Sequence, residues 1–426
     1  MSRRSAAYGL PLVFSTALIV YGILIDTTAK QAFTQLLSTR VTLPYGSNIK
    51  NNNHFLTCMR ALGIDPGTGN FDFCCIEDDV DRLVLDETIP SSLVAEDTAR
   101  VMSLVKSVSP DVVVGPSGYG LEFKKISDLT EDDLALTTLE KKAETEIQVL
   151  SGVRRLLRMM RAEGLNAFTV PGVIQLPTVP SHRKFNKIDM GTADKTCVTA
   201  YAVWDQAKKL GINYDGTRLI CLEMGLGYNA AIAVENGNIV DGIGGTIFPG
   251  PGFLALGMMD GELAYLLGDF SKKRLFEGGV AYLSNGFQES LEEFTLRRHG
   301  VYKDGWTLFL EGVVKAVAAL TAVMDVKPYE VIITGRISRV AELREEIIAM
   351  VERRLGIRCR RPANVFASRA KDVAMGAALI ANGIAGGKYA KLVETLELTK
   401  SVGTVLEYVR VPRFNPRDIL KNLRSD

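Results

Sequence analysis

Residues 62–70 read Leu-Gly-Ile-Asp-Pro-Gly-Thr-Gly-Asn, an apolar run that ends on the carboxylate of Asp65 and then alternates glycines. A Gly-x-Gly turn lets backbone N–H groups approach an anion without interference from a β-carbon. A carboxylate beside a phosphate needs a cation between them, typically hydrated Mg²⁺. Single Gly-x-Gly turns are also common in structural hairpins, so this stretch alone leaves both interpretations open.

A second copy of this stretch lies 158 residues further along the chain. Residues 222–227, Leu-Glu-Met-Gly-Leu-Gly, align with residues 64–69, Ile-Asp-Pro-Gly-Thr-Gly, and the match continues without a gap into the following strand, where Glu235 falls on Glu77. Each copy is followed by a third strand-like run. Two strand–turn–strand units in register indicate a duplicated domain. They favour a pair of phosphate loops with a Mg-nucleotide between the halves over two unrelated hairpins.

Composition limits the architecture and the partners. The chain has 426 residues, of which 47% are hydrophobic, enough to bury two cores of roughly 150–200 residues each. The net charge is +1 and no basic stripe with interleaved aromatic residues is present, so we expect no nucleic-acid partner. The 6 cysteines form no C-x-x-C pair and are typical of reduced, buried side chains in a cytoplasmic protein.

Alternating strand-like and helical patterns divide the chain. The predicted strands are 60–65, 70–78, 81–89, 111–115, 167–170 and 218–223, and the predicted helical segments are 91–108, 131–163 and 194–210. The predicted domains are an amino-terminal extension at 1–58, a first domain at 59–215, a second domain at 216–386 whose terminal helix is free to pack on the first, and a tail at 387–426.

The amino-terminal extension contains an uncharged stretch at residues 8–25, near the lower length limit for a membrane span. It follows Arg3 and Arg4 and lacks an A-x-A cleavage site. An anchor is one interpretation. The other, which we favour, is an unstructured or untranslated extension with the true start at Met59. We therefore expect no membrane association unless residues 8–25 are an anchor.

These motifs resemble those of the actin, Hsp70 and sugar-kinase superfamily. Residues 64–70 are similar to its first phosphate loop, residues 222–229 to its second, and residues 332–338, Ile-Ile-Thr-Gly-Arg-Ile-Ser, to its adenosine motif. The resemblance implies an α/β fold of duplicated RNase H-like (actin-like ATPase) domains, each a mixed five-stranded sheet with helices, with an ATP cleft between them. The nucleotide-binding residues that it implies are Asp65, Gly67, Thr68, Gly69, Asn70, Glu223, Gly225, Gly227, Tyr228, Asn229, Gly335 and Arg336.

Finer matches are to the acetate and butyrate kinase branch. Residues 238–252 resemble the segment after the second loop of butyrate kinase, and residues 191–195, Gly-Thr-Ala-Asp-Lys, resemble Gly-Thr-Ser-His-Lys of acetate kinase. Residues 371–378 resemble the last acidic helix of the branch. The resemblance covers roughly residues 59–386 and extends to an uncharacterised archaeal family described as predicted butyrate kinases. It implies ATP and Mg²⁺ as cofactors.

The chain departs from this branch at the residues that would perform phosphoryl transfer. Acetate kinase-like enzymes place a histidine before Gly-Thr and two arginines around the phosphoryl group. Here Met190 replaces the histidine, and the two arginine segments contain Pro116 and Pro251 instead. ATP binding is therefore better supported than acyl phosphate formation.

Other charged residues are candidates for the missing functions. We expect Lys195 and Arg183 to stabilise the transferring phosphoryl group, because phosphoryl transfer depends on positioning and positive charge. Asp189 or Asp194 would be the base for a hydroxyl acceptor, whereas a carboxylate acceptor needs none. The run around Arg183 is equally typical of a solvated interdomain loop. By family position, Asp65 and Asp372 are the expected Mg²⁺ ligands.

Three functions follow from this sequence. The first is a small-molecule kinase with a carboxylate (butyrate-like) acceptor or a hydroxyl acceptor. The second is an ATP-binding conformational or activator protein of the Hsp70-actin type, and the third is a nucleotide-binding remnant without turnover. The expected partner is a small-molecule substrate. A homodimer is left open, because the sequence gives no direct indication of oligomeric state.

Overall fold

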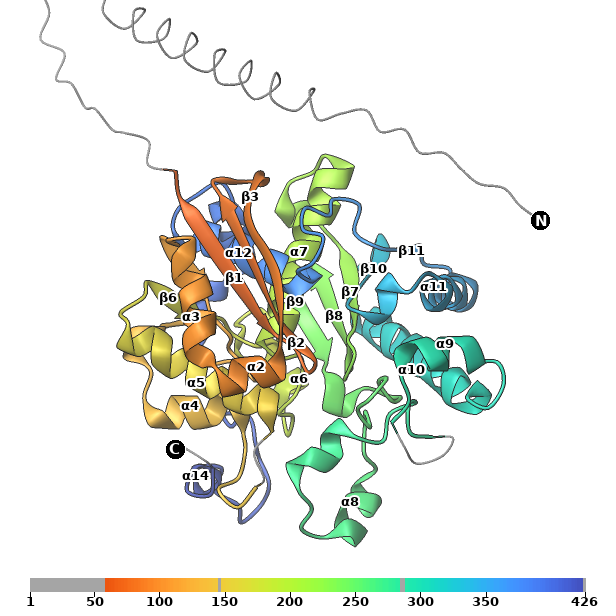
Figure 1. The fold of residues 1–426 in the computed structure, drawn as a ribbon. Helices are drawn as coiled ribbons and strands as arrows, with labels where there is room; N and C mark the ends of the chain where they lie inside the picture. The colour runs from red at the N-terminus through yellow and green to blue at the C-terminus, as the bar shows by residue number, and fades with distance from the viewer. Residues whose placement is uncertain (1–57, 145–146, 284–287, 424–426) are drawn as a thin grey trace, which may run out of the picture. The chain divides into compact units, whose positions relative to one another are not determined.

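Two mixed β-sheets carry the duplicated strand–turn–strand units (Figure 1). The first sheet contains β1 (Arg60–Pro66), β2 (Asn70–Glu77), β3 (Asp79–Pro90), β4 (Val112–Val114), β5 (Lys124–Lys125) and β6 (Ala167–Thr169). The second contains β7 (Leu219–Met224), β8 (Asn229–Glu235), β9 (Asn238–Ile243), β10 (Glu330–Thr334) and β11 (Cys359–Arg360). The strand orders are β3-β2-β1-β4-β6-β5 and β11-β10-β7-β8-β9.

The two sheets share one topology. In each, three antiparallel strands are extended through their first strand by parallel partners, β4 and β6 in the first sheet and β10 and β11 in the second. The predicted α/β fold of duplicated domains is confirmed. The first sheet differs from the prediction by a sixth strand, because the two-residue β5 pairs antiparallel with the edge of β6.

This computed structural model describes residues 58–144, 147–283 and 288–423. The apolar stretch at residues 8–25, with its two interpretations, lies outside the described residues. From Cys58 onward the chain forms one unit by its internal contacts.

The hairpin registers reproduce the sequence repeat. Asp65 of β1 lies opposite Asp72 of β2, and Glu223 of β7 lies opposite Ala230 of β8. Both pairs of positions are related by the same offset of 158 residues. The repeat read from the sequence is therefore a repeat of backbone pairing, which places both carboxylates at the end of a first strand.

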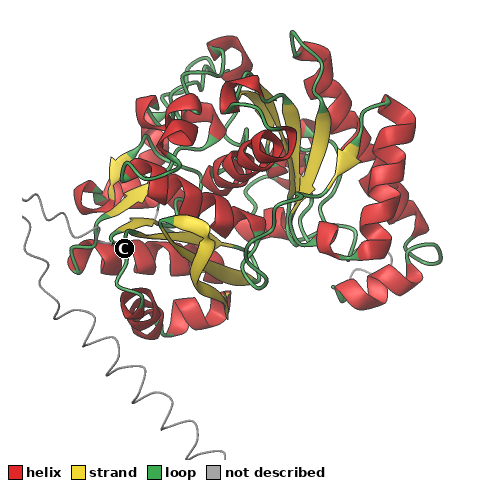
Figure 2. Cartoon of the chain, turned by 90° about the horizontal axis from the view of Figure 1, so that it is seen from above, coloured by secondary structure: helices red, strands yellow, loops and turns green. Residues whose placement is uncertain are grey.

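Helices lie around both sheets (Figure 2). They are α2 (Ser91–Glu96), α3 (Thr98–Ser107), α4 (Glu131–Thr138), α5 (Gln148–Ala162), α6 (Ser181–Lys184), α7 (Ala193–Leu210), α8 (Gly261–Leu267), α9 (Leu291–Arg297), α10 (Lys303–Val323), α11 (Ala341–Leu355), α12 (Asp372–Ile384), α13 (Ala390–Thr395) and α14 (Arg417–Leu420). The single helix predicted at 91–108 is two helices, because Asp97 ends α2 and its side chain caps α3 by accepting from the amide of Arg100.

Helices α7 and α12 lie between the two sheets and pack against each other (Figure 1). Almost every residue of α12 is buried, and its side chains belong to the core of the first sheet. Small residues permit this packing: a β-carbon on Gly376 would lie 1.9 Å from the carbonyl oxygen of Cys197, and one on Gly63 of β1 would lie 2.3 Å from the amide nitrogen of Ala378. The first sheet and α12 are therefore in direct backbone contact.

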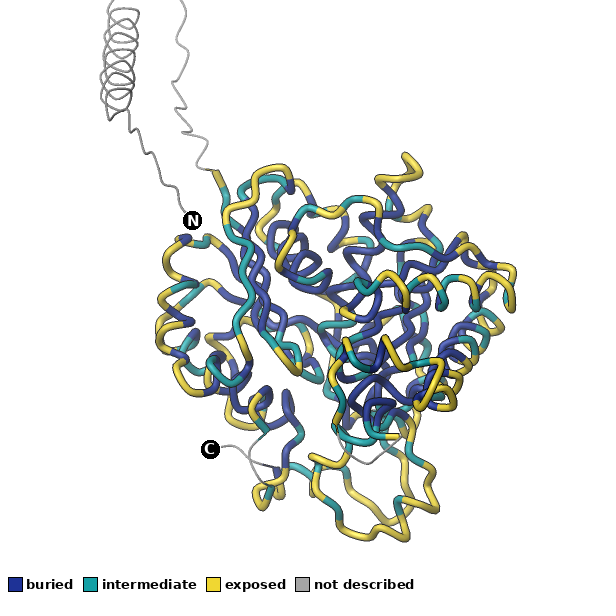
Figure 3. The backbone as a smooth tube through the Cα atoms, turned by 45° about the vertical axis from the view of Figure 1, so that its right-hand side comes forward, coloured by how far each residue is buried: buried dark blue, intermediate teal, exposed yellow. Residues whose placement is uncertain are grey.

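The second sheet has its own core, which includes α10 and α11. In the described part of the chain, α10 alone is long and apolar enough to pass for a membrane span. Its buried face, which includes Trp306, Phe309 and Val313, packs in the core of the second sheet. This burial identifies α10 as a core helix. Figure 3 shows how the buried parts of the backbone lie inside the described chain and the exposed parts at its periphery.

Candidate functional site

The two glycine loops, residues 67–70 and 225–228, have the same backbone geometry. The amide of Gly67 donates to the carbonyl of Asn70 at 3.0 Å, and the amide of Gly225 donates to the carbonyl of Tyr228 at 3.0 Å. The next two amides of each loop donate to no acceptor among the residues that the structure describes; these are the amides of Thr68, Gly69, Leu226 and Gly227. Adjacent unpaired amides in a turn form a concavity suited to an anion.

Both loops line a cavity of about 170 Å³ and lie close to each other. A β-carbon on Gly227 would lie 2.9 Å from Oγ1 of Thr68, and one on Gly69 would lie 3.4 Å from Cδ2 of Leu226. The two repeated turns, far apart in sequence, therefore lie side by side at one site.

The first loop carries a carboxylate pair bridged by a lysine. Nζ of Lys371 lies 3.1 Å from Oδ2 of Asp65 and also forms an ion pair with Asp72. Burial raises the pKa of Asp65 above its usual value, although Lys371 opposes this shift. Burial disfavours the charged ammonium, but the two carboxylates raise the pKa of Lys371 above its usual value. Lys371 therefore stays protonated.

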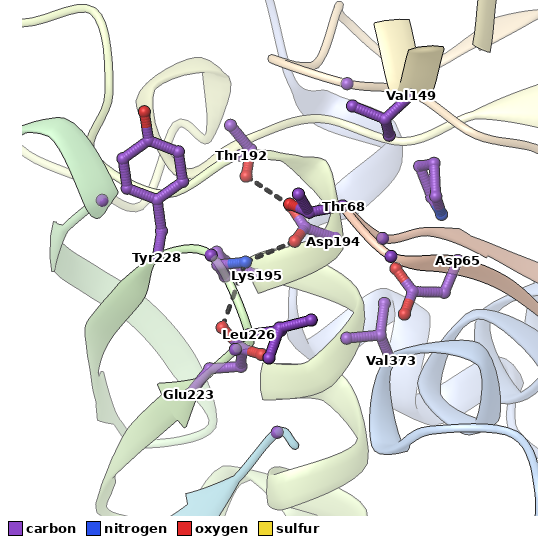
Figure 4. A pocket seen from close by; sticks show the side chains of 18 of the residues that line it. Asp65, Thr68, Val149, Thr192, Asp194, Lys195, Glu223, Leu226, Tyr228 and Val373 are labelled. Carbon is purple, nitrogen blue, oxygen red and sulfur yellow. Dashed lines mark hydrogen bonds and ion pairs between the residues drawn. The ribbon is translucent and has the colours of Figure 1, made fainter. Parts of the chain in front are cut away.

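The second loop carries a similar arrangement. Nζ of Lys195 lies 3.2 Å from Oε2 of Glu223 and forms an ion pair with Asp194, whose other oxygen accepts from the hydroxyl of Thr192 (Figure 4). Burial opposes ionisation of both carboxylates. The pKa of Glu223 is raised in consequence, whereas Lys195 holds the pKa of Asp194 below its usual value. Lys195 thus lies between two acids on the cavity wall.

Two helices begin at the cavity. Thr192 and Lys371 are the residues immediately before α7 and α12, and both line the cavity. The first amides of a helix lack intrahelical acceptors and carry partial positive charge, which favours an anion. The loop amides, the lysines and these helix ends make the site suited to phosphate groups.

The predicted adenosine motif ends at the same cavity. The amide of Gly335 donates to Oδ2 of Asp372 at 3.1 Å, while Oδ1 of Asp372 lies 3.6 Å from Arg361 and 3.8 Å from Arg339. Arg336 is exposed and lines the cavity. This motif therefore contributes one exposed cation and one fully buried carboxylate to the site.

A strap from the second sheet, residues 269–278, crosses to the end of α4. Nζ of Lys272 donates to the carbonyls of Thr138 and Leu139 at 2.6 and 3.1 Å, and burial lowers the pKa of Lys272 to about 7. The hydroxyl of Tyr228 donates to the carbonyl of Leu275 at 2.5 Å. The strap thus links the second glycine loop to the helices of the first sheet.

Three apolar residues of one helix form part of the cavity wall. Val149, Leu150 and Val153 of α5 line it, together with Leu226 of the second loop and Phe276 of the strap. These side chains face the same cavity as the glycine loops. The site therefore joins an anion-binding region to an apolar wall.

A divalent cation would find oxygen ligands but no complete protein cage. In the described ranges no three His, Cys, Asp or Glu side chains are grouped to hold a metal ion. Oδ1 of Asp372 is a buried atom without a hydrogen-bond partner there, and the buried Oε2 of Glu223 has only its ion pair with Lys195. Mg²⁺ is usually bound through one or two carboxylates, water and phosphate oxygens. The site fits Mg²⁺ brought by a nucleotide, and Asp65 and Asp372 remain predicted ligands.

All predicted site residues line the cavity except two. Asn229 is buried behind the second loop, where its amide donates to the carbonyl of Pro251 at 3.2 Å. The guanidinium of Arg183 donates to the carbonyls of Val240 and Val323 at 2.9 and 2.8 Å. Backbone carbonyls outside the cavity hold both side chains, and the predicted roles of Arg183 and Asn229 at the site stay predictions.

Asp189 lines the cavity but is already engaged. One of its oxygens accepts from the amide and hydroxyl of Thr246 at 2.9 and 3.1 Å, and the other accepts from the amide of Gly191 at 3.2 Å. These hydrogen bonds hold the Asp189 carboxylate between the chain segments that contain Gly191 and Thr246. Its predicted role as a base stays a prediction.

Sequence reasoning missed Lys371 and Asp72 as site residues. Lys371 precedes the predicted ligand Asp372, and Asp72 follows the first loop at a spacing that pairs it with Asp65 in a hairpin. The sequence signal for Lys371 was its place directly before Asp372, the acidic residue that begins a helix. The departures Met190, Pro116 and Pro251 are buried and do not line the cavity.

Solved structures define the class of fold. The chain is similar to a propionate kinase from Francisella tularensis subsp. tularensis SCHU S4, with TM-score 0.52 and 15% identity over 69% of this chain and 88% of that chain. It is also similar to an acetate kinase from Porphyromonas gingivalis, with TM-score 0.49 and 14% identity over 70% and 91%. The first likeness shows the two-domain fold of actin-like ATPase kinases.

A family model described as "Protein of unknown function (DUF1464)" matches residues 63–411, and the chain belongs to this family. No curated protein matches the chain. The finer resemblance to predicted archaeal butyrate kinases stays a prediction.

Proposed function

We propose that this protein is an ATP-dependent phosphotransferase that uses Mg²⁺ and phosphorylates a small carboxylate with a short, butyrate-like apolar chain in the cytoplasm. The observation that carries the proposal is the pair of glycine loops with unpaired amides, which lie side by side in the lining of one cavity. The fold shared with a propionate kinase supports it. Two adjacent anion-binding turns suit the phosphate chain of a nucleotide better than a single anion.

The chain's own residues would bind and orient the phosphates. The loop amides and the amino-terminal ends of α7 and α12 would hold phosphate oxygens. Lys195 would neutralise negative charge of the phosphates near Glu223. Bound Mg²⁺ would supply further charge neutralisation between phosphate oxygens and carboxylates. Catalysis of this kind rests on positioning and electrostatics, which suits a rigid site on two helices.

A carboxylate acceptor fits the site better than a hydroxyl acceptor. A hydroxyl usually needs a general base, whereas a carboxylate is already a nucleophile. Asp194 is ion-paired with Lys195, which lowers its pKa, and Asp189 accepts three hydrogen bonds. The apolar wall formed by Val149, Leu150 and Val153 suits a short alkyl chain.

The test is a screen for acceptor-dependent ADP release with Mg-ATP and a panel of short-chain carboxylates and polyols. We expect release only with a carboxylate, and trapping of the acyl phosphate by hydroxylamine. Lys195→Met should reduce kcat by about 100-fold or more, whereas Lys209→Met, at an exposed position of the same helix, should behave as the wild type. Release with polyols alone would contradict the carboxylate assignment.

A nucleotide-driven conformational protein is the second candidate. The cavity lining, within the described residues, contains no histidine and only Arg336 as arginine. The two lysines of the lining, Lys195 and Lys371, are each paired with two carboxylates, so little net positive charge is left for a transferring phosphoryl group. This charge balance favours slow hydrolysis over efficient transfer. ATP hydrolysis that no small acceptor stimulates, together with a change in protease sensitivity between ATP and ADP, would support this candidate over the kinase.

A further inference from the structure

Lys371 occupies the position where a cation is needed in the first loop. Its ammonium lies between Asp65 and Asp72, and a β-carbon on Gly67 would lie only 2.7 Å from Nζ. The residue also lines the cavity. Any side chain at position 67 would displace this ammonium, so the glycine loop and the lysine form one structural unit.

The lysines of the two loops are exchanged between the repeats. Lys195 comes from α7, which follows the first sheet in the chain, and it reaches Glu223 of the second sheet. Lys371 comes at the start of α12, which follows the second sheet, and it reaches Asp65 of the first. Each acid at a strand end therefore receives its cation from the helix that ends the other repeat. This arrangement places both ammonium groups at the cavity wall.

The ammonium of Lys371 has a donor left over. A lysine has three N–H donors, and the described residues provide two acceptors, Oδ2 of Asp65 and Oδ2 of Asp72. The unpaired amides of Thr68 and Gly69 belong to the same loop. An anion seated on these amides would approach two buried carboxylates and would be repelled unless a cation stood between them.

We propose that Lys371 is a phosphate-binding residue, a cation built into the chain that allows the first loop to bind nucleotide phosphate without a divalent ion. The proposal rests on the proposed function in one respect, namely that the ligand is a nucleotide. It differs from the role of Lys195, since Lys371 pairs with two carboxylates of one hairpin, Asp65 and Asp72, whereas Lys195 pairs with Glu223 and with Asp194 of its own helix. Glu223 faces Ala230 at the corresponding position.

The experiment measures ATP affinity of the full chain by isothermal titration calorimetry, with Mg²⁺ and with EDTA. The wild type should bind ATP in EDTA. Lys371→Met should weaken that binding by about 10-fold or more, the usual effect of removing a hydrogen bond to a charged group. Arg369→Met removes an exposed cation two residues away and serves as the control, with unchanged affinity.

A second variant separates phosphate binding from folding. Lys371→Met leaves Asp65 and Asp72 buried without their cation, so the single variant should also lose thermal stability. Adding Asp72→Asn removes one charge and retains an acceptor for Thr88. The double variant should regain stability while ATP binding in EDTA stays weak.

The outcomes distinguish this inference from the proposed function. If the double variant binds ATP in EDTA as tightly as the wild type, or if the wild type binds ATP only with Mg²⁺, Lys371 has a structural role and the inference is wrong. If the wild type binds no nucleotide under either condition, the proposed function itself fails.

Discussion

The first β-unit (β1–β3) and the second β-unit (β7–β9) share a backbone but differ in what their corresponding positions carry. The second unit has Cys221 and Ala230 where the first has Gly63 and Asp72. In the first unit, Gly63 of β1 lies against the backbone of α12. Asp65 of the same strand lies opposite a second acid, Asp72, across the hairpin. Duplication therefore preserved the anion-binding turns, while packing and charge around them diverged.

The largest expected effect is on packing. Gly63→Ala should destabilise the protein by about 3 kcal/mol, because the added methyl group would meet the backbone of α12 and force it to shift. Cys221→Ala, at the corresponding buried position, should cost only about 1 kcal/mol. Urea unfolding followed by circular dichroism measures both. Equal costs would show that the two sheets pack on their helices alike.

The acids at the strand ends should both be needed for nucleotide binding. Mg-ATP should raise the melting temperature of the wild type. Asp65→Ala and Glu223→Ala should each abolish that rise, because each variant removes the strand-end carboxylate of one loop and leaves its lysine with one acidic partner instead of two. Differential scanning fluorimetry with and without Mg-ATP is the measurement. A full response in Asp65→Ala would refute the assignment of the first loop.

The strap should make stability depend on pH. Burial lowers the pKa of Lys272 to about 7, so between pH 7 and its usual value of 10.5 the unfolded chain binds a proton that the folded chain lacks. Stability should therefore rise with pH across this window, by about 2 kcal/mol between pH 7 and pH 9. Lys272→Met should flatten the dependence. Chemical unfolding at pH 7 and pH 9 tests this, and an unchanged slope in the variant would contradict it.

The smallest expected effect is at the edge of the same strap. Lys141 and Asp269 form an exposed ion pair at 2.8 Å. Solvent and salt screen such pairs. Asp269→Asn should therefore leave the melting temperature unchanged within error, which makes it the matched control for Lys272→Met. A clear loss of stability would mean that the strap is held by its charges rather than by its buried amine.

Local patterns predicted most of the fold. The runs at 60–65 and 70–78 are β1 and β2 within one residue, because short, continuously buried apolar runs bounded by glycine turns are local signals. The break at Asp97 was missed, since a helix cap inside an amphipathic pattern changes little of its periodicity. The short strand β5 exists only through its pairing with β6.

The candidate site was predictable where it repeats and not where it depends on distant contacts. The two glycine loops could be recognised because each copy supports the other. The place of Arg183 depends on the carbonyls of Val240 and Val323, 57 and 140 residues away, which no local pattern specifies. The role of Lys371 likewise depends on the hairpin register that sets Asp72 beside Asp65.

The exchange of lysines between the repeats has a consequence for how the protein is made. The ion pair between Asp65 and Lys371 spans 306 residues of chain. During synthesis the first sheet emerges from the ribosome long before Lys371 is translated. Asp65 and Asp72 therefore lack their cationic partner until the start of α12 has been made. A fragment that ends before α12 would lack both the helix that fills the first core and the charge that completes the first loop.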